Sequence, residues 1–442
     1  MTDIVLKPEP GWRSQYRYSV YEHKLVSADK LVFSRSFIVI KNHYGVIVHF
    51  TSLHKYIGVY GNSVCRPLAA DTKAKMHYVC SMLNYILVEN YEKFRADHVF
   101  QVSKEMLDCF FRDYASERLP NGSYRGRQSI EKCVFEVATF FRKLAGSYGG
   151  YMTLKKEQLS VEKTVFTIRG KMQKKLIPNF HVRVMPERKS IFRDIPTKAF
   201  QILVNQAFLH AQDIAFAICV QAFAGLRPGE VCNMRQESSP LGSGVVLTVV
   251  DGVLKRAEID ITAEYALRSD GVICGRIKKE RRQHIYPAFL SVFGKAYSFH
   301  KEFLKTQGYE PEYGPMFVNG KGMAMTYDDY RSRFRCLVTK HARPLLLNHE
   351  DPECRLYGQL LYEHSLGLHA LRHWFSVQLV LMGEDIAQIQ YWRGDTSPES
   401  ALGYLQNKGD LLKELSAANE LFADFMMKEG AALYGKATPF SR

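Results

Sequence analysis

The chain has 442 residues, of which 46% are hydrophobic, so it can bury a core and is long enough for about two to four domains. Its 60 Lys and Arg residues against 45 Asp and Glu residues give a net charge of +15. This balance favours a polyanionic partner such as nucleic acid, the alternative being a solvated basic surface. The nine Cys residues form no C-x-x-C pair, which disfavours a zinc site and fits reduced thiols in the cytosol.

Three further classes are disfavoured by the absence of their signals. The first residues show no basic segment followed by an apolar run, so we predict no signal peptide. The sequence contains no run of about 18 apolar residues, so we predict no membrane span and no membrane partner. We expect a cytoplasmic location, with association to the nucleoid if the protein is bacterial. The segment "NGKGMAM" lacks the G-K-[ST] ending of a nucleotide-binding loop.

The first half of the chain predicts two modules and a linker. Residues 1–68 contain short β-like runs such as "SFIVIKNHYGVIVHF" and predict a β-rich N-terminal module of unknown role. Residues 70–165 repeat apolar positions at helical spacing after a capping Asp71 or Thr72, which predicts an all-helical domain. Residues 170–195 are rich in Lys, Arg and Pro and predict an extended basic interdomain linker.

The second half predicts a mainly helical α/β domain over residues 196–410. Two helices are followed by the β-like runs "GVVLTVV", "AEIDIT" and "RQHIYPAFL", which predict a small antiparallel sheet. Further helices are predicted over 327–341, 368–382, 384–391 and 398–406. Residues 411–442 are predicted to form a C-terminal helix and tail, and nothing obvious in the same chain covers the apolar face of that helix. We expect that face to dock on a neighbouring protomer, the alternative being docking within the same chain.

Several polar residues of the second half are not required by a hydrophobic core. "AFAGLRPGE" contains Arg227, "RIKKERRQHIYP" contains a basic turn, "HALRH" contains His369 and Arg372, and "SALGYLQ" contains Tyr404. Taken singly, Arg227 fits a simple ion pair with the nearby glutamate, and His369 or Tyr404 fits a core position. Taken together, they supply what phosphodiester transfer to a protein nucleophile needs. Arginines neutralise phosphate oxygens, a tyrosine attacks phosphorus, and a lysine or histidine moves the proton.

This combination resembles the tyrosine recombinase (integrase) family. The family motif G-L-R-x-x-E is matched from Gly225 to Glu230, and the motif H-x-L-R-H is matched from His369 to His373. Tyr404 follows His369 by 35 residues, a spacing that the family commonly shows. The resemblance is specific over about 196–406 and extends weakly to residues 70–165, which look like the family's core DNA-binding domain.

The resemblance implies a role for each matched residue. Arg227 and Arg372 would clamp the scissile phosphate, and His369 would act as an acid, base or hydrogen-bond donor. Tyr404 would be the nucleophile that forms a 3′-phosphotyrosine, and Glu230 would orient the first motif. The family lysine lies in a β-turn that aligns here in more than one way. Three residues are candidates for that position, with Lys278 preferred, Lys279 next, and Arg276 selected by the alternative alignment.

One position departs from the family pattern. The family usually places a His or Trp nine residues before the nucleophile, and Asp395 stands there in this chain. An ionised carboxylate beside a phosphate is repulsive. Three alternatives follow. Asp395 is protonated and donates a hydrogen bond, or its carboxylate slows the enzyme, or its carboxylate turns away from the phosphate and pairs with Arg393 or His373. We predict the last, because an ion pair requires no large pKa shift.

The resemblance therefore implies a site-specific recombinase or integrase of a mobile genetic element. Its partner would be double-stranded DNA with specific recombination sites, bound by a homo-oligomer that we expect to be a tetramer. No metal or other cofactor is expected, since the phosphotyrosine conserves the bond energy. The alternatives are a type IB topoisomerase-like enzyme and a DNA-binding protein whose catalytic site has decayed.

Overall fold

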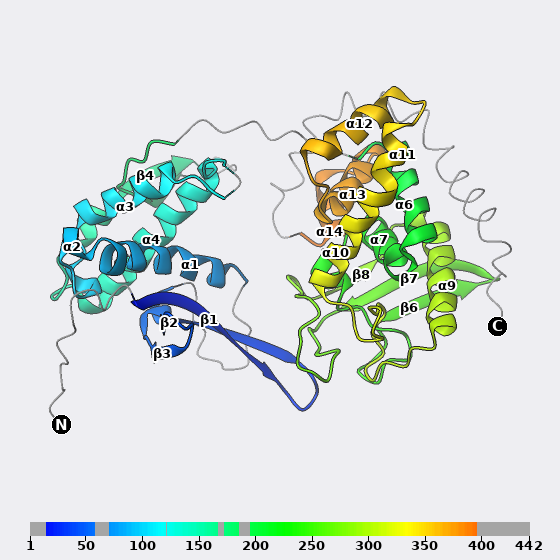
Figure 1. Ribbon diagram of the computed structural model, residues 1–442, viewed down its shortest axis with the longest axis horizontal. Coiled ribbons are helices and arrows are strands. Elements are labelled where there is room, and N and C mark those ends of the chain that lie inside the picture. The colour runs from blue at the N-terminus through cyan, green and yellow to red at the C-terminus, as the bar shows by residue number, and fades with distance from the viewer. Residues whose placement is uncertain (1–14, 58–69, 121, 167–171, 185–194, 396–442) are drawn as a thin grey trace. The chain divides into compact units, whose positions relative to one another are not determined.

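The computed structural model describes residues 15–57, 70–120, 122–166, 172–184 and 195–395 (Figure 1). The chain divides into two compact units, unit 1 with residues 1–25 and 33–190 and unit 2 with residues 26–32 and 191–442. Within the described ranges, no helix is long and apolar enough to cross a membrane. The eight cysteines in those ranges are free thiols.

Unit 1 combines a small sheet with a group of helices. The strands β1 (Tyr16–Val26), β2 (Val32–Asn42) and β3 (Ile47–Phe50) form a sheet in that order, with β2 and β3 antiparallel. A 3₁₀ turn, η2 (Leu53–Tyr56), follows. The helices then come in chain order as α1 (Ala70–Asn84), the π-helical η3 (Tyr85–Glu89), α2 (Tyr91–Phe94), the 3₁₀ turn η4 (Val99–Gln101), α3 (Lys104–Ser116), α4 (Arg127–Tyr148) and α5 (Lys156–Leu159).

The helices of unit 1 follow the predicted apolar periodicity. Helix α3 begins after Ser103, whose hydroxyl accepts a hydrogen bond from the backbone N–H of Met106. Its apolar face, with Phe110 and Phe111, packs into one core with Phe140 and Phe141 of α4. Helices therefore occupy most of residues 70–159, whereas the last residues of the predicted all-helical segment belong to strand β4 (Ser160–Phe166).

The predicted basic linker contains a strand. Strand β4 (Ser160–Phe166) pairs antiparallel with β5 (Met172–Pro178), which lies inside the 170–195 segment. The Lys174 ammonium lies 3.2 Å from the Glu162 carboxylate across this pair. The opposite charges and the backbone ladder make this part of the segment a hairpin rather than a free extended chain.

Unit 2 is mainly helical with one three-stranded sheet, so the predicted fold class of helices with a small antiparallel sheet is confirmed. The sheet has the order β6 (Val245–Val250), β7 (Val253–Ile261) and β8 (Arg281–His284), with both pairs antiparallel. The helices are α6 (Thr197–His210), α7 (Gln212–Ala224), α8 (Pro228–Val231), α9 (Leu290–Gln307), α10 (Tyr327–Leu337), the π-helical η6 (Val338–Ala342), α11 (Arg343–Leu347), α12 (Pro352–Glu363), α13 (His369–Leu381) and α14 (Ile386–Arg393).

The run "RQHIYPAFL" predicts a strand over 282–290, and the sequence analysis predicts no helix directly after it. Only the first three residues of this run lie in β8, after which Pro287 opens a 3₁₀ turn, η5 (Pro287–Phe289), and α9 follows. A glycine and several aromatic residues give α9 a weak helix propensity. Its Phe293 packs against Phe216 of α7 in the core of unit 2, and this burial outweighs the local preference.

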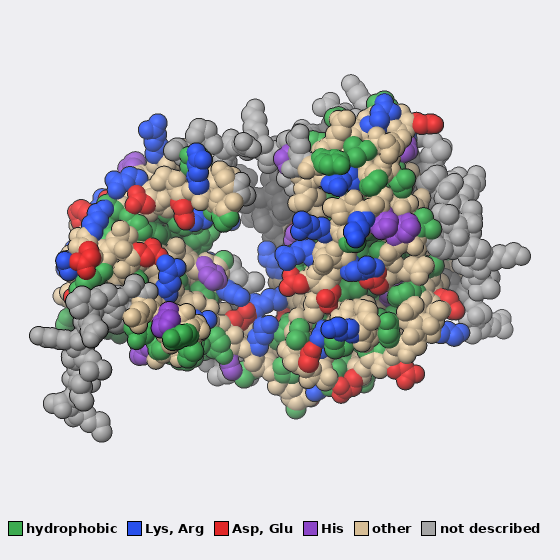
Figure 2. Space-filling view, in the orientation of Figure 1, with side chains coloured by type: hydrophobic (Ala, Val, Ile, Leu, Met, Phe, Trp, Pro, Cys, Tyr) green, Lys and Arg blue, Asp and Glu red, His purple; other side chains and the backbone are tan. Residues whose placement is uncertain are grey.

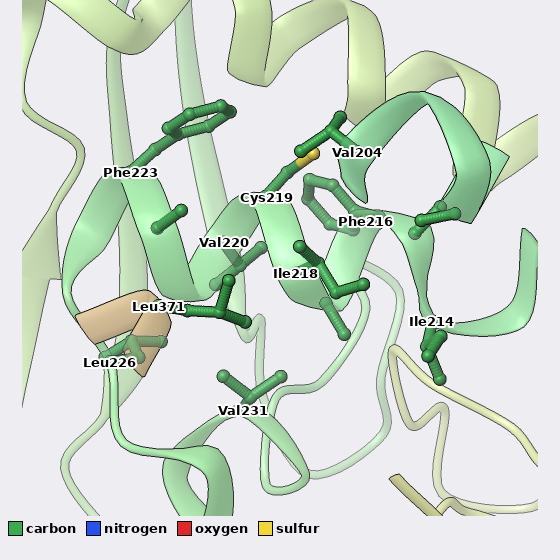
Figure 3. Close-up of a cluster of buried hydrophobic side chains, with 14 of the residues drawn as sticks. Val204, Ile214, Phe216, Ile218, Cys219, Val220, Phe223, Leu226, Val231 and Leu371 are labelled. Atoms are coloured by element: carbon green, nitrogen blue, oxygen red, sulfur yellow. The ribbon is translucent and has the colours of Figure 1, made fainter. Parts of the chain in front are cut away.

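The core of unit 2 is built around α7. Every residue from Ile214 to Ala224 is buried, and Figure 1 shows α7 in the middle of the unit, where it contacts α6, α9, α10 and α13. Figure 3 shows that Leu226 and Leu371 belong to this same cluster of buried side chains. Each leucine immediately precedes an arginine of one of the two motifs. The core therefore fixes the backbone that carries both arginines.

Candidate active site

The first motif turns the chain sharply so that Arg227 leaves the core. Gly225 ends α7 with a φ of +61°, a left-handed conformation that side chains disfavour. A Cβ atom added to Gly225 would also lie 2.3 Å from the Phe375 ring of α13. Arg227 then caps α8, and its backbone N–H donates to Oε2 of Glu230 at 2.9 Å. Its Nη1 donates to Oε1 of the same carboxylate at 3.0 Å.

Glu230 is a buried ionised anchor rather than a surface acid. Arg281 donates to both of its oxygens, at 3.2 Å from Nη1 and 3.0 Å from Nη2. Burial alone would raise the pKa of Glu230, but Arg281 and Arg227 hold it below its ordinary value. The arrangement fixes both guanidinium groups through one carboxylate.

Arg281 is a site residue that the sequence interpretation missed. Alternation along β8 would have indicated it, because side chains at positions two apart lie on the same face of a strand. Arg281 hydrogen-bonds to Gln283, which is buried, whereas Arg282 lies 3.6 Å from Glu258 outside the site. The two neighbouring arginines of β8 therefore lie on opposite faces of the strand. Arg281 belongs to the site, and Arg282 lies outside it.

The second motif places Arg372 in the first turn of α13, with its side chain only 5% exposed. Its guanidinium donates to the backbone carbonyls of Gly225 and Arg393 and to Oδ1 of Asp395. Burial, followed by the charges of Arg227 and Arg393, lowers the pKa of Arg372 to about 9, while Asp395 opposes this shift. A buried guanidinium in this setting needs an anion beside it.

Asp395 provides that anion. Its Oδ1 accepts from Nη2 of Arg227 at 2.8 Å and from Nη2 of Arg372 at 2.7 Å. Its Oδ2 lies 2.9 Å from Nε of Arg393. The predicted pairing with Arg393 is thus present. The prediction that Asp395 turns away from the site is wrong, because the carboxylate lies between the two motif arginines. Their buried charges attract it more strongly than solvent does.

The backbone turn at Gly394 allows the Asp395 carboxylate to lie between Arg227 and Arg372. It ends α14 with a φ of +62°, and a Cβ atom there would lie 2.3 Å from Nε of Arg281. The backbone of Asp395 is tied to α14 by two hydrogen bonds with Gln390, one from its N–H at 3.1 Å and one to its carbonyl at 3.2 Å. The turn therefore directs the Asp395 side chain back over the end of the helix.

His369 and Lys278 lie beside the arginine pair. His369 is the first residue of α13 and remains partly accessible to solvent. Partial burial, followed by the positive charges of Arg372, Arg227 and Lys278, lowers the pKa of His369, which favours a neutral ring at pH 7. Lys278 is exposed in the bend just before β8, so its ammonium faces solvent near this histidine.

The other two candidates for the lysine position differ in their surroundings. Arg276 is partly buried, and burial lowers its pKa. Lys279 is also partly buried, and its backbone carbonyl accepts from Nη1 of Arg281 at 2.9 Å. The influence of Lys278 on His369 makes Lys278 the candidate with an identified electrostatic link to the motif residues.

Tyr404 lies outside the described residues, as do the helices predicted over 398–406 and 411–428. Among the residues that the structure does describe, Tyr391 of α14 is an exposed tyrosine, and it lines a cavity together with Arg281 and Asp395. Tyr391 is therefore the tyrosine against which a nucleophilic role for Tyr404 has to be tested. In Figure 2, Lys, Arg and His side chains gather on unit 2 over the region of α10, α13 and α14.

Comparison with solved structures finds low-identity neighbours over most of the chain. An integrase of the Tn1549 transposon in complex with transposon right-end DNA is 15% identical, covers 80% of this chain and 95% of its own, and has a TM-score of 0.44. The XerH site-specific recombinase bound to a palindromic difH substrate is 16% identical, covers 78% and 79%, and has a TM-score of 0.44. A lambda integrase dimer bound to a COC′ core site is 12% identical, covers 77% and 90%, and has a TM-score of 0.43.

The structural neighbours are tyrosine recombinases and integrases. No family model matches the sequence, and no curated protein matches it. TM-scores below 0.5 do not support an assignment of function, so the function has to be inferred from the residues of this chain and their geometry.

Proposed function

We propose that this chain is a tyrosine recombinase that cleaves and rejoins double-stranded DNA through a 3′-phosphotyrosine intermediate. The observation that carries the proposal is the convergence of Arg227 and Arg372 on a single anionic oxygen, at 2.8 and 2.7 Å. Two guanidinium groups aimed at one oxygen match the needs of a phosphoryl group that gains negative charge as it reacts. Lys278 lies close enough to this pair for its charge to contribute, after burial and the charges of Arg372 and Arg227, to the lowered pKa of His369.

The residues divide the reaction between them. The Tyr404 hydroxyl attacks phosphorus, the bond from phosphorus to the 5′ oxygen breaks, and the arginines hold the non-bridging oxygens. Lys278 donates a proton to the leaving 5′ oxygen, which departs as a hydroxyl. His369, neutral at pH 7, accepts the tyrosine proton or hydrogen-bonds to the phosphate. A 5′-hydroxyl then attacks the phosphotyrosine, which releases Tyr404 and rejoins the strand. Because the bond energy is conserved, no cofactor is required.

Glu230 and Arg281 are positioning residues in this proposal. The Glu230 side chain is fully buried and holds the Arg227 guanidinium through an ion pair, while Arg281 neutralises the Glu230 carboxylate. Arg227 therefore presents Nη2 to the anion position while its Nη1 is held by the carboxylate. A guanidinium fixed in advance loses little freedom when it binds a phosphate.

We further propose that the DNA partner carries specific recombination sites and that the chain acts in a mobile genetic element. The net charge of +15 suits contacts to a phosphate backbone. Rejoining strands from two duplexes requires four active sites, so a tetramer is the assembly proposed here.

The test uses a nicked suicide duplex that loses a short 5′-hydroxyl fragment after cleavage and so traps the covalent adduct. The wild-type chain is expected to give a denaturation-resistant DNA adduct, and Tyr404→Phe is expected to give none while still binding the duplex. Tyr391→Phe serves as the matched control and should retain the adduct. A phosphotyrosyl peptide that maps to Tyr391 would overturn the assignment of the nucleophile. Joining of two different duplexes separates a recombinase from a topoisomerase-like enzyme.

Asp395 favours one second candidate, a DNA-binding protein without cleavage activity. A carboxylate at the phosphate position is what a decayed site would contain. On this alternative, both the wild-type chain and Asp395→Asn bind duplex DNA, and neither forms an adduct with the suicide substrate. An adduct with the wild-type chain excludes this candidate, whereas an adduct with Asp395→Asn alone would show that the carboxylate is what prevents cleavage.

A further inference from the structure

We propose that Asp395 is an internal occupant of the phosphate position. Its carboxylate fills the anion position between Arg227 and Arg372 in the DNA-free chain and is exchanged for a phosphate when DNA enters. The inference rests on the function proposed above and adds a step that controls access to the same site.

The geometry defines one anion position and shows what fills it. Oδ1 of Asp395 accepts from Nη2 of both arginines at distances typical of charge-assisted hydrogen bonds. A non-bridging phosphate oxygen is the same kind of acceptor. Since both donors are already directed at Oδ1, a phosphate oxygen reaches them only after this carboxylate oxygen has moved.

Charge and burial explain why the position is filled in the absence of DNA. The side chains of Arg372, Arg393 and Asp395 are 5%, 9% and 10% exposed, so three ionic groups share a space with little water. Three arginines without an anion would repel one another in this space, as Arg227 and Arg393 do in lowering the pKa of Arg372. Asp395 supplies the missing negative charge from the chain itself.

The local backbone allows an exchange. Asp395 follows Gly394 directly, at the end of α14, and its backbone is held by Gln390 independently of its carboxylate. The two carboxylate oxygens also have different partners, since Oδ2 lies 2.9 Å from Nε of Arg393. A rotation of the side chain can therefore withdraw Oδ1 from the motif arginines while Arg393 remains close enough to pair with the carboxylate.

The first experiment probes the anion position with inorganic sulfate, a tetrahedral divalent anion, and requires no cleavage activity. The melting temperature of the full chain is measured against sulfate concentration at constant ionic strength, for the wild type, Asp395→Asn and Asp395→Ala. Asp213→Asn is the matched control, because Asp213 also pairs with a guanidinium, that of Arg333, outside the site. Its response defines the general stabilisation that sulfate gives any protein.

The expected result is a saturable rise in melting temperature for both Asp395 variants, with half-saturation at a sulfate concentration at least tenfold below that of the wild type. Adding Arg227→Ala to Asp395→Asn should remove the saturable part. Asp395→Asn keeps the size and one acceptor oxygen of the side chain, so it remains informative if Asp395→Ala does not fold. Equal sulfate responses in the wild type, Asp395→Asn and Asp213→Asn would overturn the proposal.

A second measurement separates failure of this inference from failure of the proposed function. The suicide duplex is presented to the wild type and to Asp395→Asn, and adduct formation is followed in a single turnover. A tenfold sulfate effect without any adduct in either protein keeps the internal occupant and rejects the cleavage function. Adducts together with equal sulfate responses reject the internal occupant and keep the cleavage function.

Discussion

Arg372 and Asp395 form a buried ion pair, with Nη2 of the arginine 2.7 Å from Oδ1 of the aspartate. The two residues come from different elements, the first turn of α13 and the residue that follows the Gly394 cap of α14. Their pairing ties the end of α14, and with it the start of the segment that carries Tyr404, to the second motif. The same carboxylate oxygen also contacts Arg227, so one contact joins both motifs.

The arginine pair is expected to dominate the rate of cleavage. Replacement of Arg227 or Arg372 by Ala should slow single-turnover adduct formation by about 10² to 10³-fold, or roughly 2.7 to 4 kcal/mol, the cost typical of losing one donor to a charged transition state. Arg333→Ala is the control, since Arg333 pairs with Asp213 away from the site. Near-normal rates in both motif variants would show that the resemblance to the recombinase motifs is accidental.

Glu230 is expected to matter for stability as well as for rate. Glu230→Gln removes the buried negative charge that pairs with Arg281 and Arg227. Removing one partner of a buried ion pair lowers the free energy of unfolding by about 3 to 5 kcal/mol. Urea unfolding followed by circular dichroism measures this cost. Asp328→Asn, which breaks an exposed pair with Arg331, should leave the unfolding midpoint nearly unchanged. Equal midpoints for the two variants would show that Glu230 is not an electrostatic anchor.

The buried His300 and the half-buried His373 predict a loss of stability in mild acid. Burial lowers the pKa of His300 to about 4, and burial with the charge of Arg393 lowers that of His373 to about 4. In the unfolded chain both would bind a proton near the ordinary value of about 6.5, so between these values the unfolded state holds more protons. Stability is therefore expected to fall as the pH drops from about 6.5 to about 4, by an amount on the order of a few kcal/mol.

The variants His300→Asn and His373→Asn test this assignment by urea unfolding at pH 7 and pH 5. Each is expected to lose less stability between the two pH values than the wild type, whatever its stability at pH 7. His23→Asn, a change of an exposed histidine, should lose as much as the wild type. If both buried-site variants show the wild-type difference, other groups are responsible for the acid sensitivity.

DNA affinity is expected to depend steeply on salt. Each phosphate that the protein contacts releases counterions and should contribute about −0.9 to the slope of log Kobs against log salt concentration. Fluorescence anisotropy of a labelled duplex between 50 and 200 mM salt is the measurement, with the wild-type chain and an unrelated basic protein in parallel. An affinity that does not change with salt would indicate a protein partner in place of DNA.

Residues 411–442 are expected to join protomers on DNA. One face of the predicted helix is apolar, with the residues Leu411, Leu415, Ala418, Phe422 and Phe425. A chain that ends at residue 410 should bind a single DNA site with unchanged affinity and fail to bring two sites together in a gel-shift or light-scattering assay. Normal pairing of two sites by the truncated chain would show that the segment packs on its own protomer.

Several elements and site residues are predictable from the sequence alone, because their signals are local. Apolar runs predicted α6, α7 and α13, and the two motifs predicted that Arg227, His369 and Arg372 belong to one site. These features need only neighbouring residues, because a helix face or a motif turn is encoded within a few positions. Leu226 and Leu371 were predictable as core residues for the same reason. The predicted capping positions 71 and 72 lie inside α1, which begins at Ala70, so that prediction was wrong.

The balance of charges in the site, by contrast, follows from the folding of unit 2. Arg281 comes from β8 and contacts Glu230, while Asp395 follows α14 and contacts Arg227, Arg372 and Arg393. The sequence places Asp395 near the site but does not show that its carboxylate lies between the two motif arginines. The same holds for α9, whose weak helix propensity is overridden by packing on α7. Ion pairs in a buried site depend on distances between segments far apart in the chain, and the folded core of unit 2 sets those distances.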